Sequence, residues 1–196
     1  MALLDATTLE SALSLLAEEM ESKAIPRHEL VICGGSALLA LQLAQRTTRD
    51  VDVLARLDAN MKLSEPKPLA PELVEAAERV GRLLNLPANW LNTGPSDQLK
   101  AGLPTGFVNR LVSREIGPAL RVHYTDRYDL IHLKLFALVD QGPGKHSQDL
   151  RALHPTEEEL LAAARWVITQ DDGPEFPNLL RSILKEIGHE DIARQI

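Results

Sequence analysis

The segment that decides the fold is VICGGSALLALQLAQRTTRDVDVLA, residues 31–55. It opens inside an apolar, partly β-branched run, ELVIC at residues 29–33, which predicts a buried strand. The run ends at Gly34 and Gly35, a pair that indicates a tight turn. Residues 36–46 are then strong helix formers. The segment therefore predicts a strand, a glycine turn and a helix as one unit.

The end of this segment, DVDVLA at residues 50–55, alternates two aspartates with apolar residues. That alternation is the period of a strand and places Asp50 and Asp52 on one face. Like charges on one face repel and are costly to bury, so something must compensate them. A divalent cation would do so, and magnesium sites combine one or two carboxylates with substrate phosphates. The pair therefore predicts a site for Mg²⁺ or Mn²⁺.

The glycine turn supplies the other half of such a site. Without side chains, Gly34 and Gly35 let backbone N–H groups approach an anion at the start of the helix. Ser36, a residue favoured at a helix N-cap, adds a hydroxyl there. Arg49 flanks the aspartates as a phosphate ligand, although helix capping and ion pairing explain an arginine at that place nearly as well. We expect a phosphate-binding turn beside the metal carboxylates.

The rest of the chain alternates helical patterns with few strand patterns. Helices are expected over residues 8–23, 71–86, 127–141, 154–170 and 177–196, the last split at Gly188, with strands at 119–126 and 90–92. This pattern predicts an α+β fold, in which a small mixed sheet carries packed helices. We expect residues 1–154 to form the core with its N-terminal helix. Residues 155–196 are then a C-terminal helical segment packed on that core as a single compact unit.

Composition excludes several classes of protein. The formal charge of −7 over 196 residues argues against broad adhesion to nucleic acid, although it leaves room for a local basic pocket. No apolar run approaches the roughly 18 residues that span a bilayer, and the acidic N-terminal region does not resemble a secretion signal. One cysteine excludes an intramolecular disulfide and fits a reducing compartment. We therefore expect a cytoplasmic protein with no membrane partner.

The motifs resemble those of a known superfamily. GGS, followed after thirteen residues by DVD, is similar to the signature of the DNA polymerase beta-type nucleotidyltransferases. The likeness is strongest to small bacterial proteins related to the AbiEii abortive-infection toxins, in which the glycine turn precedes an R-x-T-x-D-hydrophobic-D pattern. Residues 46–52, RTTRDVD, stand in that pattern. The resemblance covers roughly residues 30–168.

The resemblance continues downstream of the aspartates. Such proteins carry a lysine inside an apolar helix and then a D-L pair in a basic loop; Lys134 stands in the first place, and Asp149 with Leu150 in the second. A lysine on an apolar face needs a carboxylate, a phosphate or a route to water, and Asp149 could be that carboxylate. A snorkelling side chain explains Lys134 alone at least as well.

The resemblance implies transfer of a nucleoside monophosphate from a nucleoside triphosphate to a hydroxyl, with pyrophosphate leaving. Asp50 and Asp52 would hold the metal, with Lys134 and Asp149 as further catalytic residues. The acceptor is not identified by the sequence, because RNA, protein hydroxyls and small molecules are all served by this superfamily. The resemblance also suggests a toxin-like component of a toxin–antitoxin or phage-defence system, with a cognate partner protein.

The chain departs from the superfamily at one point. Many members use a third carboxylate from a later strand, and the run LRVHY at residues 120–124 contains none. Asp126 could complete the metal set, His123 could take the place, or Lys134 and Asp149 could serve instead. Loss of activity is the remaining option, which would leave an antitoxin-like module that binds a protein partner or a nucleotide.

Overall fold

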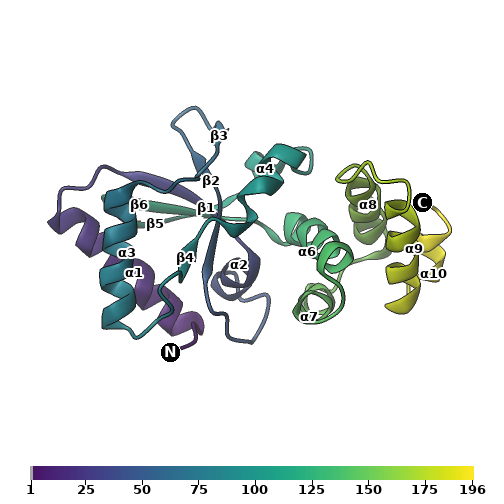
Figure 1. Cartoon of the computed structure of the whole chain (residues 1–196), viewed down its shortest axis with the longest axis horizontal. Helices are drawn as coiled ribbons and strands as arrows, with labels where there is room; N and C mark the ends of the chain where they lie inside the picture. Colours follow the sequence, from purple (N-terminus) through teal and green to yellow (C-terminus); the bar gives the residue numbers. More distant parts are fainter. Residues whose placement is uncertain (1) are drawn as a thin grey trace. The chain divides into compact units, whose positions relative to one another are not determined.

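The computed structural model describes residues 2–196, and Figure 1 labels its elements. Contacts divide the chain into two compact units, the first ending at Asp126 and the second running from Arg127 to Ile196. The boundary expected after residue 154 falls inside the second unit, because the helix Arg127–Gln141 packs against the helices Lys145–Ala152 and Glu157–Ile168, which lie on either side of that boundary. Within the described residues, no helix combines the length and the apolar character needed to cross a membrane.

The first unit is an α+β unit, as expected. Its elements are α1 (Ala6–Ser22), β1 (His28–Cys33), α2 (Gly34–Ala40), β2 (Val51–Leu57), β3 (Leu63–Ser64), α3 (Pro71–Leu83), β4 (Leu91–Asn92), the 3₁₀ helix η1 (Gly94–Asp97), α4 (Gln98–Ala101), α5 (Phe107–Arg110), β5 (Val112–Gly117) and β6 (Leu120–Tyr124). The strands form one mixed sheet in the order β3-β2-β1-β6-β5, and β4 pairs with β2. β1 is parallel to β6 and antiparallel to β2. The expected mixed sheet is therefore confirmed.

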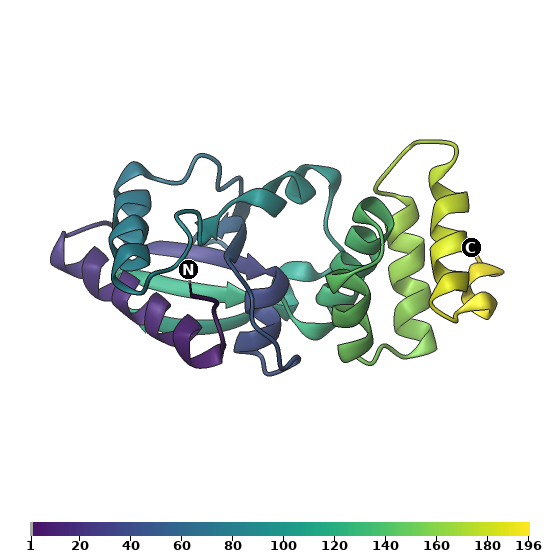
Figure 2. The same ribbon diagram turned by 60° about the horizontal axis from the view of Figure 1, so that its bottom comes forward.

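One face of this sheet carries α1 and α3, which pack on each other (Figure 2). The apolar residues of α1 recur at helical spacing and are buried, as Leu13 and Leu16 show. Trp90 is fully buried, and its indole N–H donates to the carbonyl oxygen of Ala77 at 2.8 Å. A Cβ on Gly81 would lie 2.9 Å from the Trp90 ring, so this glycine lets α3 approach the indole closely. The apolar core thus fixes the strands that carry the glycine turn and the aspartates.

The helix after the glycine turn is shorter than expected. α2 ends at Ala40, whereas the sequence predicted a helix to residue 46. Gln42 adopts φ +57°, and the N–H of Leu43 donates to the carbonyl oxygen of Leu38 at 2.8 Å. A left-handed residue followed by this backward hydrogen bond is a Schellman stop. This backbone turn ends α2 although good helix formers follow it in the sequence.

The second unit is helical. Its elements are α6 (Arg127–Gln141), α7 (Lys145–Ala152), α8 (Glu157–Ile168), α9 (Phe176–Glu186) and α10 (Glu190–Ala193). α6 packs against both α7 and α8. α8 begins at the capping box in which Thr156 accepts from the Glu159 N–H and Glu159 accepts from the Thr156 N–H. The residues around Asp149, expected to lie in a loop, form α7.

Candidate active site

The Gly34–Gly35 turn joins β1 to α2 and has little free space around it. Gly34 adopts φ +71°, and a Cβ there would clash with the carboxylate of Asp52. A Cβ on Gly35 would lie 2.8 Å from both Nη2 of Arg46 and Oγ1 of Thr48. Only glycine permits both approaches together with the positive φ. The turn therefore brings a carboxylate, a guanidinium and a hydroxyl against the backbone of two successive residues.

Asp52 is positioned by the sheet. It lies opposite Cys33 in the antiparallel pair of β1 and β2, directly before the glycine turn. On its other side β4 pairs with β2 and sets Asn92 opposite Asp52. The Asn92 amide donates to Oδ1 of Asp52 at 3.1 Å, and its own oxygen accepts from the N–H of Gly94 at 2.7 Å. Asn92 therefore holds the Asp52 carboxylate over the turn.

Asp50 lies immediately before β2 and is oriented by Thr48, two residues earlier in the chain. Its Oδ1 accepts a hydrogen bond from Oγ1 of Thr48 at 3.3 Å. Asp50 and Asp52 are half-buried, while Val51 and Val53 between and after them are fully buried. The predicted alternation is thus confirmed: apolar side chains face the core and both carboxylates reach the partly exposed side.

This donor set suits a hard divalent cation. Two half-buried carboxylates beside a glycine turn are the protein ligands that a magnesium site needs when substrate phosphates complete the coordination. Among residues 2–196, no three His, Cys, Asp or Glu side chains gather closely enough to hold a metal ion by themselves. The residues fit a metal that arrives with its substrate, and they do not form an all-protein cage.

The expected third carboxylate does not stand on β6. The strand position beside Cys33 belongs to Thr125, whose N–H donates to the carbonyl oxygen of Ile32 at 2.9 Å. The Thr125 hydroxyl is buried and has no hydrogen-bond partner among the described residues. Asp126 lies one residue further on, with Oδ1 4.0 Å from Nε of Arg110. A place for Asp126 in the metal site stays a prediction.

His123 is engaged elsewhere. It pairs with Val31, two residues before Cys33 on β1, and lies between Ser113 and Glu29. The structure therefore gives no support to His123 as the substitute for the missing carboxylate.

Ser36 and Arg49 differ from expectation in their details. Ser36 lies inside α2 and not at its N-cap, and its buried hydroxyl donates to the carbonyl oxygen of Cys33 at 3.1 Å. Arg49 is exposed, whereas Arg46 is the arginine that lies against the turn. Sequence reasoning missed Thr48 and Asn92 as supports. Thr48 stands in the R-x-T-x-D pattern and could have been found there, but Asn92 is identified only by strand register.

Lys134 and Asp149 belong to the second unit, where they join α6 to α7. Nζ of Lys134 lies 2.6 Å from Oδ2 of Asp149, and the two side chains are 7% and 1% exposed. The expected pairing of this lysine with this carboxylate is confirmed. Burial of both charges is explained by the pairing itself, so their catalytic role stays a prediction.

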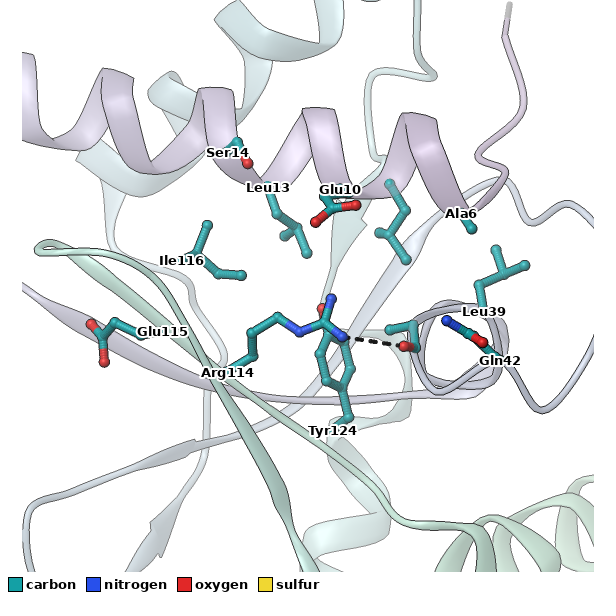
Figure 3. Close-up of a pocket in the computed structure, with 12 residues that line it drawn as sticks. Ala6, Glu10, Leu13, Ser14, Leu39, Gln42, Arg114, Glu115, Ile116 and Tyr124 are labelled. Atoms are coloured by element: carbon teal, nitrogen blue, oxygen red, sulfur yellow. Dashed lines mark hydrogen bonds between the residues drawn. The ribbon is translucent and has the colours of Figure 1, made fainter.

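A separate cavity lies on the face of the sheet that carries α1, away from Asp52, between α1 and β5 (Figure 3). Its volume is about 440 Å³. The Arg114 guanidinium lies over the Tyr124 ring, 5.7 Å from its centroid, and Nη2 donates to the Ala40 carbonyl oxygen at 3.5 Å. Burial raises the pKa of Tyr124 to about 12, so the phenol stays neutral. Arg114 and Tyr124 alternate with Ser113 and His123, which face the side of the sheet that carries Asp52.

Comparison with known proteins adds a family to this geometry. No curated protein and no solved structure matches the chain. A family model described as "Nucleotidyltransferase of unknown function (DUF6036)" matches residues 11–151, which include the glycine turn, both aspartates and the Lys134–Asp149 pair. The match covers more than half of the chain, and we conclude that the chain belongs to this nucleotidyltransferase family.

Proposed function

We propose that the protein transfers a nucleoside monophosphate from a nucleoside triphosphate to a hydroxyl acceptor, with Mg²⁺ or Mn²⁺ as cofactor. The observation that carries the proposal is the Asp52 carboxylate held against Gly34 by Asn92, with Asp50 held beside it by Thr48. Family membership supports nucleotidyl transfer in general. The carboxylate pair adds the reason to expect a metal.

Each residue of the turn has a role in this proposal. Asp50 and Asp52 hold the cation, which when bound would neutralise the triphosphate and stabilise the attacking and leaving oxygens. Gly34 and Gly35 let the phosphates approach the backbone closely. Arg46, beside Gly35, and the more exposed Arg49 are the cations of this segment that meet the negative charge on the phosphates. Asn92 and Thr48 keep the carboxylates oriented.

Label transfer tests the proposal. The purified protein is incubated with each α-labelled nucleoside triphosphate, Mg²⁺ or Mn²⁺, and either total RNA or a protein extract as acceptor. We expect label on one acceptor class and a loss of at least about 100-fold in Asp50→Asn and in Asp52→Asn, because each removes one charged metal ligand. Asp140→Asn, a change of an exposed aspartate of α6, is the matched control and should keep full activity.

One structural observation favours a second candidate. Thr125, the residue that follows β6, supplies no carboxylate to deprotonate the acceptor. A chain that binds a nucleotide or a partner protein without turnover, as an antitoxin-like module does, would not need this carboxylate. Metal-dependent thermal stabilisation by a triphosphate without label transfer would identify this second function. If no triphosphate gave either thermal stabilisation or label transfer, the proposal would be overturned.

The toxin-like role is tested separately. If the protein modifies an essential acceptor, its induced expression should stop growth, and Asp52→Asn should relieve the arrest. Growth arrest that persists in Asp52→Asn would point away from nucleotidyl transfer as its cause.

A further inference from the structure

Three polar side chains from three adjacent strands form a hydrogen-bonded row on the sheet. Oγ of Ser113 on β5 lies 2.8 Å from Nδ1 of His123 on β6. Nε2 of the same imidazole lies 3.0 Å from Oε2 of Glu29 on β1. Ser113 and His123 are directly opposite in the antiparallel pair, so their side chains share a face. The row has the order hydroxyl, imidazole, carboxylate that activates a serine nucleophile.

The protonation states suit that order. Burial lowers the pKa of His123, against the opposing effect of the Glu29 carboxylate, so the imidazole is neutral at neutral pH. Burial alone would raise the pKa of Glu29, but hydrogen bonds from His123 and Arg27 outweigh it and keep the carboxylate ionised. An ionised Glu29 takes the Nε2 proton of the neutral ring, which leaves Nδ1 to accept from Ser113.

Access and charge also suit a reaction at Ser113. The serine is exposed on β5, an edge strand of the sheet, whereas the side chain of His123 is only 2% exposed. Arg121 lies two residues before His123 on the same face of β6. Its Nε is buried and makes no hydrogen bond among the described residues, although it lies 3.9 Å from Oε2 of Glu115, the residue opposite it on β5. The face that carries Ser113 thus also carries a guanidinium, a group that can stabilise an oxyanion.

We propose that Ser113, His123 and Glu29 form a nucleophilic serine site that cleaves small carboxylic esters. The Ser113 Oγ–H bond breaks as its proton passes to Nδ1 of His123, and Oγ bonds to the ester carbonyl carbon. The leaving alkoxide takes the proton from Nδ1 and departs as the alcohol. Water then attacks the acyl-serine, gives up a proton through His123, and releases the carboxylic acid with Ser113 restored.

This site is separate from the glycine turn. Glu29 stands near the start of β1 and the turn follows its end, while Ser113 lies on the strand at the edge of the sheet. The ester reaction needs no nucleotide and no metal ligand from β2. Its success or failure is therefore independent of the proposed nucleotidyl transfer.

A fluorophosphonate probe and 4-nitrophenyl acetate test the inference on the full chain. We expect one covalent adduct per chain, mapped to Ser113 by mass spectrometry, and release of 4-nitrophenolate. Ser113→Ala should abolish both. Ser64→Ala is the matched control, because Ser64 is an exposed serine on β3 at the other end of the same sheet, and it should change neither.

Glu29→Gln tests the carboxylate as a positioning residue. Labelling should slow by at least about tenfold, because the amide no longer stabilises the imidazolium. The pH at which the labelling rate reaches half its maximum should also fall, since Glu29 raises the pKa of His123. An unmodified Ser113, labelling of Ser64 at the same rate, or a Glu29→Gln profile identical to that of the parent chain would overturn the proposal.

Discussion

Two pairs of charged side chains stand out in this protein, one in each unit, and they are handled in opposite ways. Asp50 and Asp52 are half-buried carboxylates that accept hydrogen bonds from the neutral groups of Thr48 and Asn92. Lys134 and Asp149 are almost fully buried and neutralise each other at 2.6 Å. A hydroxyl or amide orients a carboxylate without cancelling its charge, whereas an ammonium cancels it.

In the function that we propose, this difference separates a carboxylate pair that binds a cation together with the substrate phosphates from an ion pair that is neutralised within the protein. The first pair lies at a partly exposed surface, where a metal ion with its phosphates would offset the two carboxylates. In the second pair the attraction between the two charges offsets the cost of burying them. Removal of one partner would therefore lower the stability of the protein. Both pairs belong to the motifs of the family resemblance, yet burial assigns them different physical tasks.

The largest expected effect is on stability and comes from breaking the buried pair. Lys134→Met leaves the Asp149 carboxylate, 1% exposed, without its ammonium. We expect the free energy of unfolding to fall by about 3–5 kcal/mol, as is typical when one partner of a buried ion pair is removed. Urea unfolding followed by circular dichroism measures it. A loss below about 1 kcal/mol would show that the pair does not stabilise the packing of α6 against α7.

Its control also tests catalysis. The double variant Lys134→Met with Asp149→Leu removes both charges and should recover most of the lost stability, because no charge is left unpaired. If this folded variant still transfers label, Lys134 and Asp149 have no catalytic role. If it is folded and inactive, the catalytic prediction is supported.

The next prediction concerns the close contact between Gly34 and the Asp52 carboxylate. Gly34→Ala must adopt φ +71° and place a methyl group against the Asp52 carboxylate. Gly142→Ala must adopt φ +81° but has no atom within 4 Å of the new methyl group. We expect about 1–2 kcal/mol of backbone strain in both variants. Gly34→Ala should lose about 1–3 kcal/mol more through overpacking.

Activity separates the same two variants. Displacing Asp52 should abolish label transfer in Gly34→Ala, whereas Gly142→Ala should keep it. Equal stability losses and equal activities would mean that Asp52 moves aside without consequence, which would contradict a site built on its contact with Gly34.

Much of the core could be predicted from sequence, because local patterns determine it. The alternation around Asp50 and Asp52, the Gly34–Gly35 turn and the helix α1 all follow from period and turn chemistry. The capping box at Thr156 and Glu159 fixed the start of α8 in the same way. These features need no knowledge of distant residues.

What was missed depends on partners far along the chain. β5 carries four exposed residues in succession, Val112 to Glu115, so an edge strand shows no apolar alternation. α7 is polar, and the family resemblance predicts a loop there, although burial of Ser147, Asp149 and Leu150 stabilises it as a helix. The contact of Asn92 with Asp52 follows from the pairing of β4 with β2 across 40 residues, which no local pattern encodes.

A smaller effect is expected at that contact. Asn92→Ala removes one hydrogen bond to Asp52 and one from Gly94, and should cost about 1–2 kcal/mol in the free energy of unfolding. Asn92→Asp keeps the acceptor for Gly94 but sets a like charge beside Asp52. We therefore expect Asn92→Asp to bind Mg²⁺ with altered affinity while its loop stays intact. Unchanged label transfer in both variants would show that Asn92 does not orient Asp52.

The smallest effect compares the buried pair with a partly exposed one in the same unit. Arg127 binds Glu159 through two hydrogen bonds of 2.6 and 2.9 Å, and their side chains are 35% and 22% exposed. Glu159→Gln should lower the free energy of unfolding at neutral pH by about 0.5–1 kcal/mol, far less than Lys134→Met, because solvent screens the charges.

The pH dependence of this effect has a definite sign. The hydrogen bonds from Arg127 hold the pKa of Glu159 below its ordinary value of 4.5. The stabilisation is therefore complete above pH 4.5 and is lost as the pH falls through the lower folded-state pKa, where the carboxyl group takes up its proton. Urea midpoints of the parent chain and of Glu159→Gln should converge over that acidic range. Glu157→Gln, at an exposed position in the same first turn of α8, is the matched control and should change the free energy of unfolding at neutral pH less than Glu159→Gln does. Midpoints of Glu159→Gln that diverge from those of the parent on acidification would mean that Arg127 does not hold this carboxylate in the folded state.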